Sequence, residues 1–255
     1  MKTEVQSLTK VFKTESFFSG GIRRVKALDD VSAVFEEGRI TAVVGESGSG
    51  KTTLARCIAG LEHADSGAVL IGGKPADYSD MALRRAVQYV FQDTYNALNP
   101  RKTTGAAIEE PLKVHFGLKG SALRDRAMQI LYSAGLSEKQ YLKFPHELSG
   151  GQRQRAGIAR ALALEPKILI ADEPVSSLDV SVQAQILNLL LDLNVKGLAI
   201  IFITHDLRVV GDFAEKVIVM KSGRIAEEGR TKDIFSSPSD AYTKKLLEAV
   251  PKARF

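Results

Sequence analysis

Short apolar runs alternate with amphipathic stretches along most of the chain. The runs are rich in β-branched residues and too short for buried helices, so each is predicted to form a strand. They comprise Ile40–Gly45, Val87–Gln92, Lys167–Asp172, Leu198–Thr204 and Lys216–Met220. Uniformly apolar strands are typical of a parallel sheet covered on both faces. Their alternation with helical segments predicts an α/β domain with a mainly parallel sheet.

A different pattern opens the chain. Glu4–Phe12 and Val25–Phe35 alternate polar and apolar residues, and Ala68–Ile71 is a similar short run. Such alternation is typical of strands with one covered and one solvated face. We therefore predict an N-terminal antiparallel β subdomain, in which a loop at Gly20 and Gly21 separates the first two strands.

Helical periodicity replaces the strand pattern in the middle of the chain. Apolar residues recur there at helical spacing, as at Leu123, Ala127 and Ile130, and Gly135 is a helix-ending residue. The pattern predicts an inserted helical subdomain. The predicted division is a helical subdomain of residues 93–160 within an α/β core of residues 1–92 and 161–235, which includes the antiparallel β subdomain.

The last segment, residues 236–255, is predicted to be a short C-terminal tail. Ala241–Val250 fits a helix with Leu246 and Leu247 facing inward, and Pro251 is expected to end it. We therefore expect residues 1–255 to form a single domain that consists of the core, the helical insertion and this tail.

Composition narrows the class of protein. Hydrophobic residues make up 44% of the chain and charged residues 25%, which is the balance of an ordinary globular domain. No apolar run approaches the roughly 18 residues that span a bilayer, and no apolar stretch follows the N-terminus, so we expect neither a membrane span nor a signal peptide. The net charge of +5 is scattered, without a basic stripe, so we expect no nucleic-acid partner.

The single cysteine, Cys57, excludes an internal disulfide and a thiolate metal cluster within one chain. We expect it to be a small buried hydrophobic residue on a helix. An unbridged cysteine fits the cytoplasm.

The most specific motif follows the strand at Ile40–Val44 and precedes a helical segment, Thr53–Ala59. It matches the pattern G-x-x-x-x-G-K-[ST], a loop whose backbone N–H groups and helix N-terminus surround phosphate oxygens. We expect it to bind ATP·Mg²⁺; a glycine-rich turn without a ligand is the alternative. The predicted ATP-binding residues here are Gly45, Glu46, Ser47, Gly48, Ser49, Gly50, Lys51, Thr52 and Thr53.

Two side chains of this loop have distinct expected roles. The ammonium of Lys51 would reach the β- and γ-phosphates, and the hydroxyl of Thr52 would bind Mg²⁺.

A pair of carboxylates ends the apolar run Ile168–Ala171. Ligands sit at the carboxyl ends of strands in parallel α/β sheets, so we expect Asp172 to hold Mg²⁺ and Glu173 to take a proton from an attacking water. Taken alone, such a pair is more often a solvated strand end.

A third motif, Leu148-Ser149-Gly150-Gly151-Gln152, precedes a helical stretch at Arg153–Ala163. Ser149 could cap that helix, and the glycines would let an anion approach its N–H groups. By itself this loop is only a helix cap.

Together these residues resemble the nucleotide-binding domain of ATP-binding cassette (ABC) transporters, from roughly Met1 to Gly229. Leu148–Gln152 stands as that family's signature sequence. Gln92 resembles its Q-loop glutamine, Ser177-Leu178-Asp179 its D-loop and His205 its switch histidine. The resemblance implies a P-loop NTPase core with the antiparallel and helical subdomains described above.

The resemblance also implies a mechanism. Two domains face head to tail, and each ATP lies between Gly45–Thr52 of one and the signature of the other. Glu173 is implied as the general base, His205 as a catalytic contact to the γ-phosphate, and Gln92 as a ligand of ATP and Mg²⁺ that reports to membrane subunits. The residues implied to contact ATP in trans are Leu148, Ser149, Gly150, Gly151, Gln152 and Asp179.

An aromatic residue near the N-terminus usually stacks on adenine in this family. Phe12 is the candidate, and Phe17 and Phe18 are alternatives. For Phe12, ordinary core packing carries near-equal weight.

Phe91-Gln92-Asp93, Ala97–Arg101 and the tail Ala241–Leu247 are similar to the importer branch for oligopeptides, dipeptides and nickel. The chain departs from it at Asp240-Ala241, where that branch often has His-Pro. The sequence also stops at Phe255, four residues after the proline that many members follow with a cysteine-bearing extension. The resemblance implies an ATPase at the cytoplasmic membrane face. Implied partners are a second ATPase subunit, identical or paralogous, transmembrane permeases and an extracytoplasmic solute-binding protein.

Other classes of ATPase fit less well. A soluble ABC ATPase not coupled to transport usually has tandem cassettes or a coiled-coil insertion. A GTPase would need an Asn-Lys-x-Asp guanine reader, which Asn194–Gly197 is not. A ring-forming helicase-like ATPase would not use Leu148–Gln152.

Overall fold

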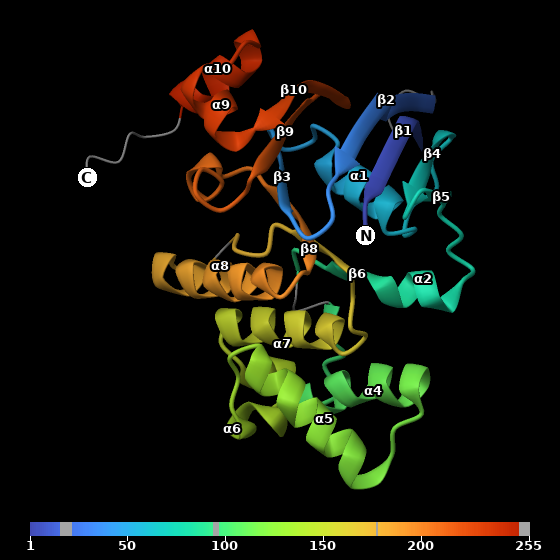
Figure 1. The fold of residues 1–255 in the computed structure, drawn as a ribbon, viewed down its shortest axis with the longest axis vertical. Helices are drawn as coiled ribbons and strands as arrows, with labels where there is room; N and C mark the ends of the chain where they lie inside the picture. Colours follow the sequence, from blue (N-terminus) through green and yellow to red (C-terminus); the bar gives the residue numbers. More distant parts are fainter. Residues whose placement is uncertain (16–21, 94–96, 177, 250–255) are drawn as a thin grey trace. The chain divides into compact units, whose positions relative to one another are not determined.

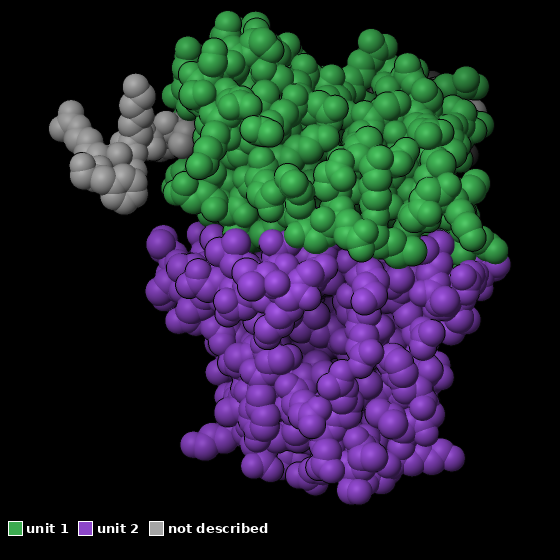
Figure 2. Space-filling view, viewed as in Figure 1, with its two compact units in different colours: residues 1–78, 201–255 green, residues 79–200 purple. Residues whose placement is uncertain are grey.

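The structure is a computed structural model, and it describes residues 1–15, 22–93, 97–176 and 178–249. The chain forms two compact units. Unit 1 comprises Met1–Tyr78 and Ile201–Phe255, and unit 2 comprises Ser79–Ile200 (Figure 2). In the described ranges no helix is both long and apolar enough to cross a membrane.

Unit 1 contains an antiparallel sheet built from the start of the chain (Figure 1). Its strand order is β2-β1-β4-β5, and Thr3 on β1 lies between Phe35 on β2 and Ile71 on β4. This confirms the predicted antiparallel pairing; the predicted loop at Gly20 and Gly21 lies outside the described residues. The strands are β1 (Thr3–Glu15), β2 (Ile22–Phe35), β4 (Ser66–Ile71) and β5 (Lys74–Pro75).

Unit 1 also contains the strand that leads into the P-loop motif. This strand, β3, is buried along its whole length and pairs in parallel with β9, with Ala42 opposite Val217. β9 pairs antiparallel with β10 on its other side, and β8 neighbours β3. The bounds are β3 (Ile40–Val44), β8 (Ala199–Thr204), β9 (Lys216–Lys221) and β10 (Arg224–Arg230).

The helices of unit 1 are short. Cys57 is buried on α1, as predicted, and its burial raises the pKa of its thiol to about 11. Leu246 and Leu247 on α10 line a small apolar cavity with Val44 and Val219, so they face inward as predicted. The helices are α1 (Lys51–Ile58), the 3₁₀ turn η2 (Leu207–Val209), α9 (Thr231–Ser236) and α10 (Ala241–Glu248).

Unit 2 combines two parallel strands with a helical region. β6 and β7 pair with Tyr89 opposite Ile170, and the described part of residues 93–160 contains helices and no strand, as predicted. Figure 1 shows α7 beside α8. The elements are α2 (Met81–Ala86), β6 (Val87–Val90), α4 (Thr104–Phe116), α5 (Gly120–Ser133), α6 (Glu138–Tyr141), η1 (Pro145–Glu147), α7 (Gly150–Leu162), β7 (Ile168–Asp172) and α8 (Val180–Val195).

A hydrophobic core joins the helices of unit 2. The predicted apolar face of α5, with Leu123, Ala127 and Ile130, is buried in it. Gly105 on α4 lies against the ring of Tyr141, and a Cβ there would collide with that ring. Close helix packing thus fixes the region that carries the signature helix, α7.

Candidate functional site

The P-loop, Gly45–Thr52, connects β3 to α1 in unit 1. Gly45 and Gly50 have φ angles of 147° and 106°, which only glycine adopts without strain. A Cβ on Gly45 would collide with the carbonyl oxygen of Met220, and one on Gly50 with that of Ala27. The loop therefore lies directly against β9 and β2, and glycine is required at both positions.

Lys51 is folded over this loop. Its side chain is only 5% exposed, and its Nζ donates hydrogen bonds of 2.8 Å to the carbonyl oxygens of Gly45 and Glu46. The hydroxyl of Ser49 is buried, and no described residue forms a hydrogen bond with it. A cation, an unsatisfied hydroxyl and the N-terminus of α1 thus meet at one loop, which suits an anionic ligand.

The helix after the P-loop begins at Lys51, two residues before the predicted start at Thr53. Lys51, Thr52 and Thr53 therefore form its first turn. The reason is the left-handed conformation of Gly50, which ends the loop at the N-cap position.

His205 follows β8 and is exposed. It lines a cavity of about 430 Å³ together with Glu46 of the P-loop, Asp206, Arg208 and Tyr242 of α10. The guanidinium of Arg208 binds the carboxylate of Asp206 at 2.6 Å and lowers the pKa of that carboxyl. Unit 1 therefore brings the predicted switch histidine and the start of the P-loop to the same cavity.

Unit 2 places the predicted carboxylates at the end of β7. Asp172 is 3% exposed, and its Oδ2 accepts a 2.7 Å hydrogen bond from the hydroxyl of Tyr89. Glu173 has a φ angle of 46°, and its Oε2 accepts a 2.9 Å hydrogen bond from Nε2 of Gln92. The predicted general base and the predicted Q-loop glutamine are therefore in direct contact.

The backbone of Glu173 is strained. A left-handed conformation costs a non-glycine residue about 1–3 kcal/mol and occurs preferentially at functional sites. Ser176 stabilises the turn, because its N–H and hydroxyl both donate to the carbonyl oxygen of Glu173, at 3.2 and 2.9 Å.

The signature loop begins α7 in unit 2. Ser149 Oγ accepts from the N–H of Gln152 at 3.3 Å, and Gln152 Oε1 accepts from the N–H of Ser149 at 3.1 Å. This capping box confirms Ser149 as the helix cap and starts α7 at Gly150 rather than at Arg153. Gly150, Gly151 and Gln152 therefore form its first turn. Leu148 is 4% exposed and packs in the core of unit 2, so its side chain anchors the loop.

Asp179, the predicted D-loop residue, caps α8. Its Oδ1 accepts hydrogen bonds from the N–H of Val182 at 2.9 Å and the hydroxyl of Ser181 at 2.7 Å. These hydrogen bonds lower the pKa of Asp179. Ser177 of the same motif lies outside the described residues.

Phe12, the candidate for adenine stacking, lies on β1 with its side chain 39% exposed. The alternative that it packs in the core is therefore wrong. The Nζ of Lys10 lies 5.2 Å from the centre of its ring. Phe17 and Phe18 lie outside the described residues.

Two tyrosines at the site were not predicted from the sequence. Tyr89 binds Asp172 as described above, and the hydroxyl of Tyr242 accepts a 3.1 Å hydrogen bond from the backbone N–H of Glu46. A tyrosine within the otherwise aliphatic and amide-bearing strand Val87–Val90 was the one available signal for Tyr89. Tyr242 lies in the tail segment that resembles the importer branch, but nothing in that segment linked it to the P-loop.

Thr52, Gln92 and Asp172, the predicted Mg²⁺ ligands, offer a hydroxyl, an amide oxygen and a carboxylate, the hard oxygen donors that Mg²⁺ prefers. Thr52 belongs to unit 1 and the other two to unit 2. The described ranges contain no cluster of three or more His, Cys, Asp or Glu side chains suited to a metal. The donor chemistry of each of these residues, taken by itself, suits Mg²⁺.

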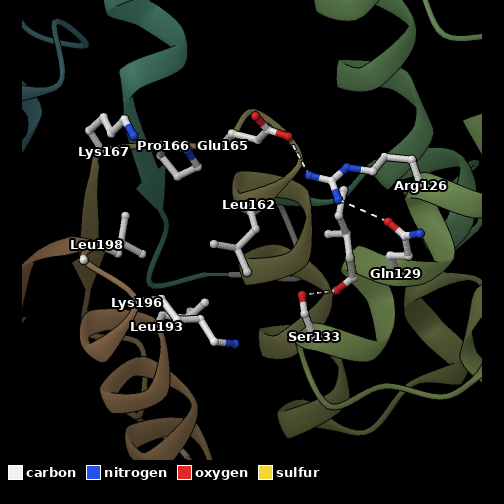
Figure 3. Close-up of a pocket in the computed structure, with 12 residues that line it drawn as sticks. Arg126, Gln129, Ser133, Leu162, Glu165, Pro166, Lys167, Leu193, Lys196 and Leu198 are labelled. Atoms are coloured by element: carbon white, nitrogen blue, oxygen red, sulfur yellow. Dashed lines mark hydrogen bonds and ion pairs between the residues drawn. The ribbon is translucent and has the colours of Figure 1, made fainter.

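A larger cavity, of about 520 Å³, lies elsewhere in unit 2 (Figure 3). Arg126 and Glu165 at its edge form a 2.5 Å ion pair. Lys167, Lys196 and Leu198 also line it, and it contains none of the predicted site residues.

Comparison with known proteins decides the family. Residues 28–176 match the family model described as "ABC transporter". The chain belongs to this family. The resemblance inferred from its motifs is therefore confirmed, and membership of the ABC transporter family implies an ATP-binding, ATP-hydrolysing domain.

Several relatives within the ABC family are named as transport or import ATP-binding proteins. The dipeptide transport ATP-binding protein DppF of Haemophilus influenzae is 47% identical over 235 residues, which are 90% of this chain and 72% of the relative. The di/tripeptide transport ATP-binding protein DppF of Pseudomonas aeruginosa is 43% identical, and the match covers 96% of this chain and 78% of the relative. The glutathione import ATP-binding protein GsiA of Escherichia coli K12 is 46% identical, over 91% of this chain but 38% of that protein.

Solved ABC cassettes share the fold. The ATP-binding cassette MJ0796, solved as a dimer in a post-hydrolysis state bound to ADP and Pi, has a TM-score of 0.80 at 33% identity and covers 90% of this chain and 99% of that one. CbiO1 of Clostridium perfringens, part of the transporter complex cbiONQ, has a TM-score of 0.78 at 33% identity. The match covers 92% of this chain and 90% of that one. These likenesses confirm the predicted α/β fold class.

Proposed function

We propose that this chain binds ATP·Mg²⁺ and hydrolyses it as the motor subunit of an ABC importer for small peptides. The observation that carries the proposal is the P-loop of an ABC family member. Its two required glycines, buried Lys51 and unsatisfied Ser49 form a site for phosphate oxygens.

In unit 1, ATP binding requires Lys51 to exchange partners. Its ammonium would leave the carbonyl oxygens of Gly45 and Glu46 and donate to the β- and γ-phosphates instead, and the hydroxyl of Thr52 would hold Mg²⁺. The N–H groups of the first turn of α1 add partial positive charge. His205 contacts the γ-phosphate, and the exposed ring of Phe12 stacks on adenine.

In unit 2, Glu173 acts as the general base. The hydrogen bond from Gln92 orients one of its carboxylate oxygens, and the other oxygen accepts the proton of the attacking water. Tyr89 similarly orients Asp172, whose carboxylate would hold Mg²⁺. The amide oxygen of Gln92 would also bind Mg²⁺, while its Nε2 continues to donate to Glu173.

A second ATPase subunit completes each site. The first turn of α7, capped by Ser149, presents N–H groups to the γ-phosphate of the ATP that is bound to the P-loop of the second subunit. Asp179 lies at this interface between the two subunits. A solved relative that is a dimer bound to ADP and Pi supports this arrangement. Permease subunits and an extracytoplasmic binding protein would place the pair at the cytoplasmic membrane face.

The relatives named for dipeptides, di/tripeptides and glutathione support small peptides as the transported class. None of these names supports nickel complexes, the other predicted substrate. The same names favour transport over a soluble ABC ATPase. Vesicles that contain the permeases and this ATPase should take up labelled dipeptide when ATP is supplied, and uptake of a nickel complex alone would contradict the peptide assignment.

Glu173→Gln tests the catalytic proposal. The amide cannot accept the proton of water, so we expect ATP binding to persist while turnover falls by about 10²–10⁴-fold. Light scattering should show a dimer that is stable in ATP. Glu138→Gln, at an exposed position on α6, is the control and should keep wild-type turnover. Unchanged hydrolysis by Glu173→Gln would refute the assignment of the base.

A further inference from the structure

The C-terminal helix α10 is tied to the P-loop. The hydroxyl of Tyr242 accepts the N–H of Glu46 at 3.1 Å, across 196 positions of the chain. The carbonyl oxygen of Glu46 accepts a 2.8 Å hydrogen bond from the ammonium of Lys51. Both backbone groups of Glu46 are therefore engaged, one by α10 and one by the lysine expected to bind phosphate.

The ring of Tyr242 is held in place. The Nζ of Lys221 lies 4.7 Å from its centre, within cation–π distance. Lys221 follows Met220, whose carbonyl oxygen leaves room only for a glycine at position 45. The tyrosine thus packs beside the strand end that shapes the P-loop.

The start of α10 is fixed in turn by β10. Glu227 accepts from the N–H and hydroxyl of Ser239, at 2.7 and 2.6 Å, and from the N–H of Asp240 at 3.2 Å. Asp240 caps α10 and accepts from the N–H of Tyr242 at 2.8 Å. A continuous path of hydrogen bonds runs from β10 through the cap of α10 to the P-loop.

We propose that Tyr242 is a positioning residue of the ATP site, which holds the start of the P-loop in the conformation that receives phosphate, and that Glu227 acts through it. This inference rests on the proposed binding of ATP at Gly45–Thr52.

Loss of the hydrogen bond between Tyr242 and Glu46 should weaken the affinity for ATP. Without the hydroxyl, the N–H of Glu46 exchanges its partner for water and the loop samples more conformations. A ligand must then order the loop as it binds, which weakens apparent affinity without changing the chemical step.

The test uses the full chain with Tyr242→Phe, which removes only the hydroxyl. We expect the dissociation constant and KM for ATP to rise about fivefold, the effect of one neutral hydrogen bond, while kcat stays within twofold. Tyr132→Phe, an exposed tyrosine of α5, is the matched control and should bind as the wild type does.

Glu227→Gln tests the path behind Tyr242. It should also raise the KM for ATP, but by a smaller factor. The double variant Tyr242→Phe/Glu227→Gln should bind ATP no more weakly than Tyr242→Phe alone, because both changes act on one contact. Glu248→Gln, on the exposed face of α10, should bind ATP normally.

The outcomes separate the two proposals. A wild-type chain that does not bind ATP contradicts the proposed function. Normal ATP binding by both the wild type and Tyr242→Phe overturns the inference alone, as does a fall in kcat with KM unchanged. Additive losses in the double variant overturn the role given to Glu227.

Discussion

Single residues at the site owe their placement to contacts that no motif encodes. The glycines, Lys51 and Thr52 of the P-loop could be predicted because the backbone itself demands that spacing. Tyr89 and Tyr242 could not, because their partners lie 83 and 196 positions away in the sequence. The strained φ of Glu173 is likewise a result of tertiary structure.

Gly50→Ala should abolish measurable ATP binding. The φ angle of Gly50 is 106°, and a Cβ would collide with the carbonyl oxygen of Ala27, so the loop must move away from β2. Gly73→Ala is the control: its φ angle of 78° is similarly left-handed, but no atom lies within 4 Å of the added Cβ. The control should lose about 1 kcal/mol of stability and keep its ATP affinity in calorimetry. Equal affinity in both variants would contradict this account.

Elements were predicted most reliably where the hydrophobic pattern was clear, whether uniformly apolar or periodic. The apolar strands and the pattern of α5 are examples. Helix starts were displaced, because Gly50 and Ser149 set them through local backbone geometry and capping. The helix α8 was not predicted: its sequence around Leu189–Leu193 is apolar on nearly every side, and only Ile186, Leu190 and Leu193 are buried.

The anchoring of α10 should depend on pH. Partial burial alone would raise the pKa of Glu227, but hydrogen bonds from Ser239 and Asp240 hold it at about 2, below its ordinary 4.5. A lowered pKa means that the carboxylate stabilises the fold fully above pH 4.5 and progressively less as the pH falls toward 2. The melting temperature of Glu227→Gln should therefore be lower than that of the wild type at pH 7, and this difference in melting temperature should shrink below pH 4.5.

Melting curves recorded by circular dichroism from pH 7 to pH 3 measure that difference. Glu248→Gln should show a small difference that does not vary with pH. A gap between Glu227→Gln and the wild type that widens in acid would contradict the assigned direction of the pKa.

At the scale of the whole molecule, functional residues are divided between two units. The P-loop and His205 belong to unit 1, while Glu173, the signature and Asp179 belong to unit 2. The alternation of strand and helix patterns predicted the α/β class, and the family resemblance linked the motifs of both units. The proposed partner subunit could be inferred from the family resemblance alone, because a second chain leaves no periodicity in this one.

Mixing two inactive variants tests head-to-tail sites. Lys51→Ala disables the P-loop, and Ser149→Glu places a negative charge where the signature should meet phosphate. Each alone should not hydrolyse ATP. Equimolar mixing should restore about a quarter of wild-type activity, because half of the dimers then contain one intact site.

A second mixture of two inactive variants is the control for the head-to-tail arrangement. Lys51→Ala and Glu173→Gln both disable the half-site that holds the phosphates, so their mixed dimer has no intact site and should remain inactive. Activity in this second mixture, or none in the first, would contradict the proposed arrangement.

The burial of Cys57 has a practical consequence for such experiments. The thiolate is the form of cysteine that attacks thiol reagents, and a pKa of about 11 keeps that form scarce at neutral pH. The wild-type chain should therefore resist labelling while folded. A cysteine introduced at Tyr132 or Ser149, both exposed, would carry a fluorophore at one chosen place, and the spectroscopic background of the chain would be close to zero.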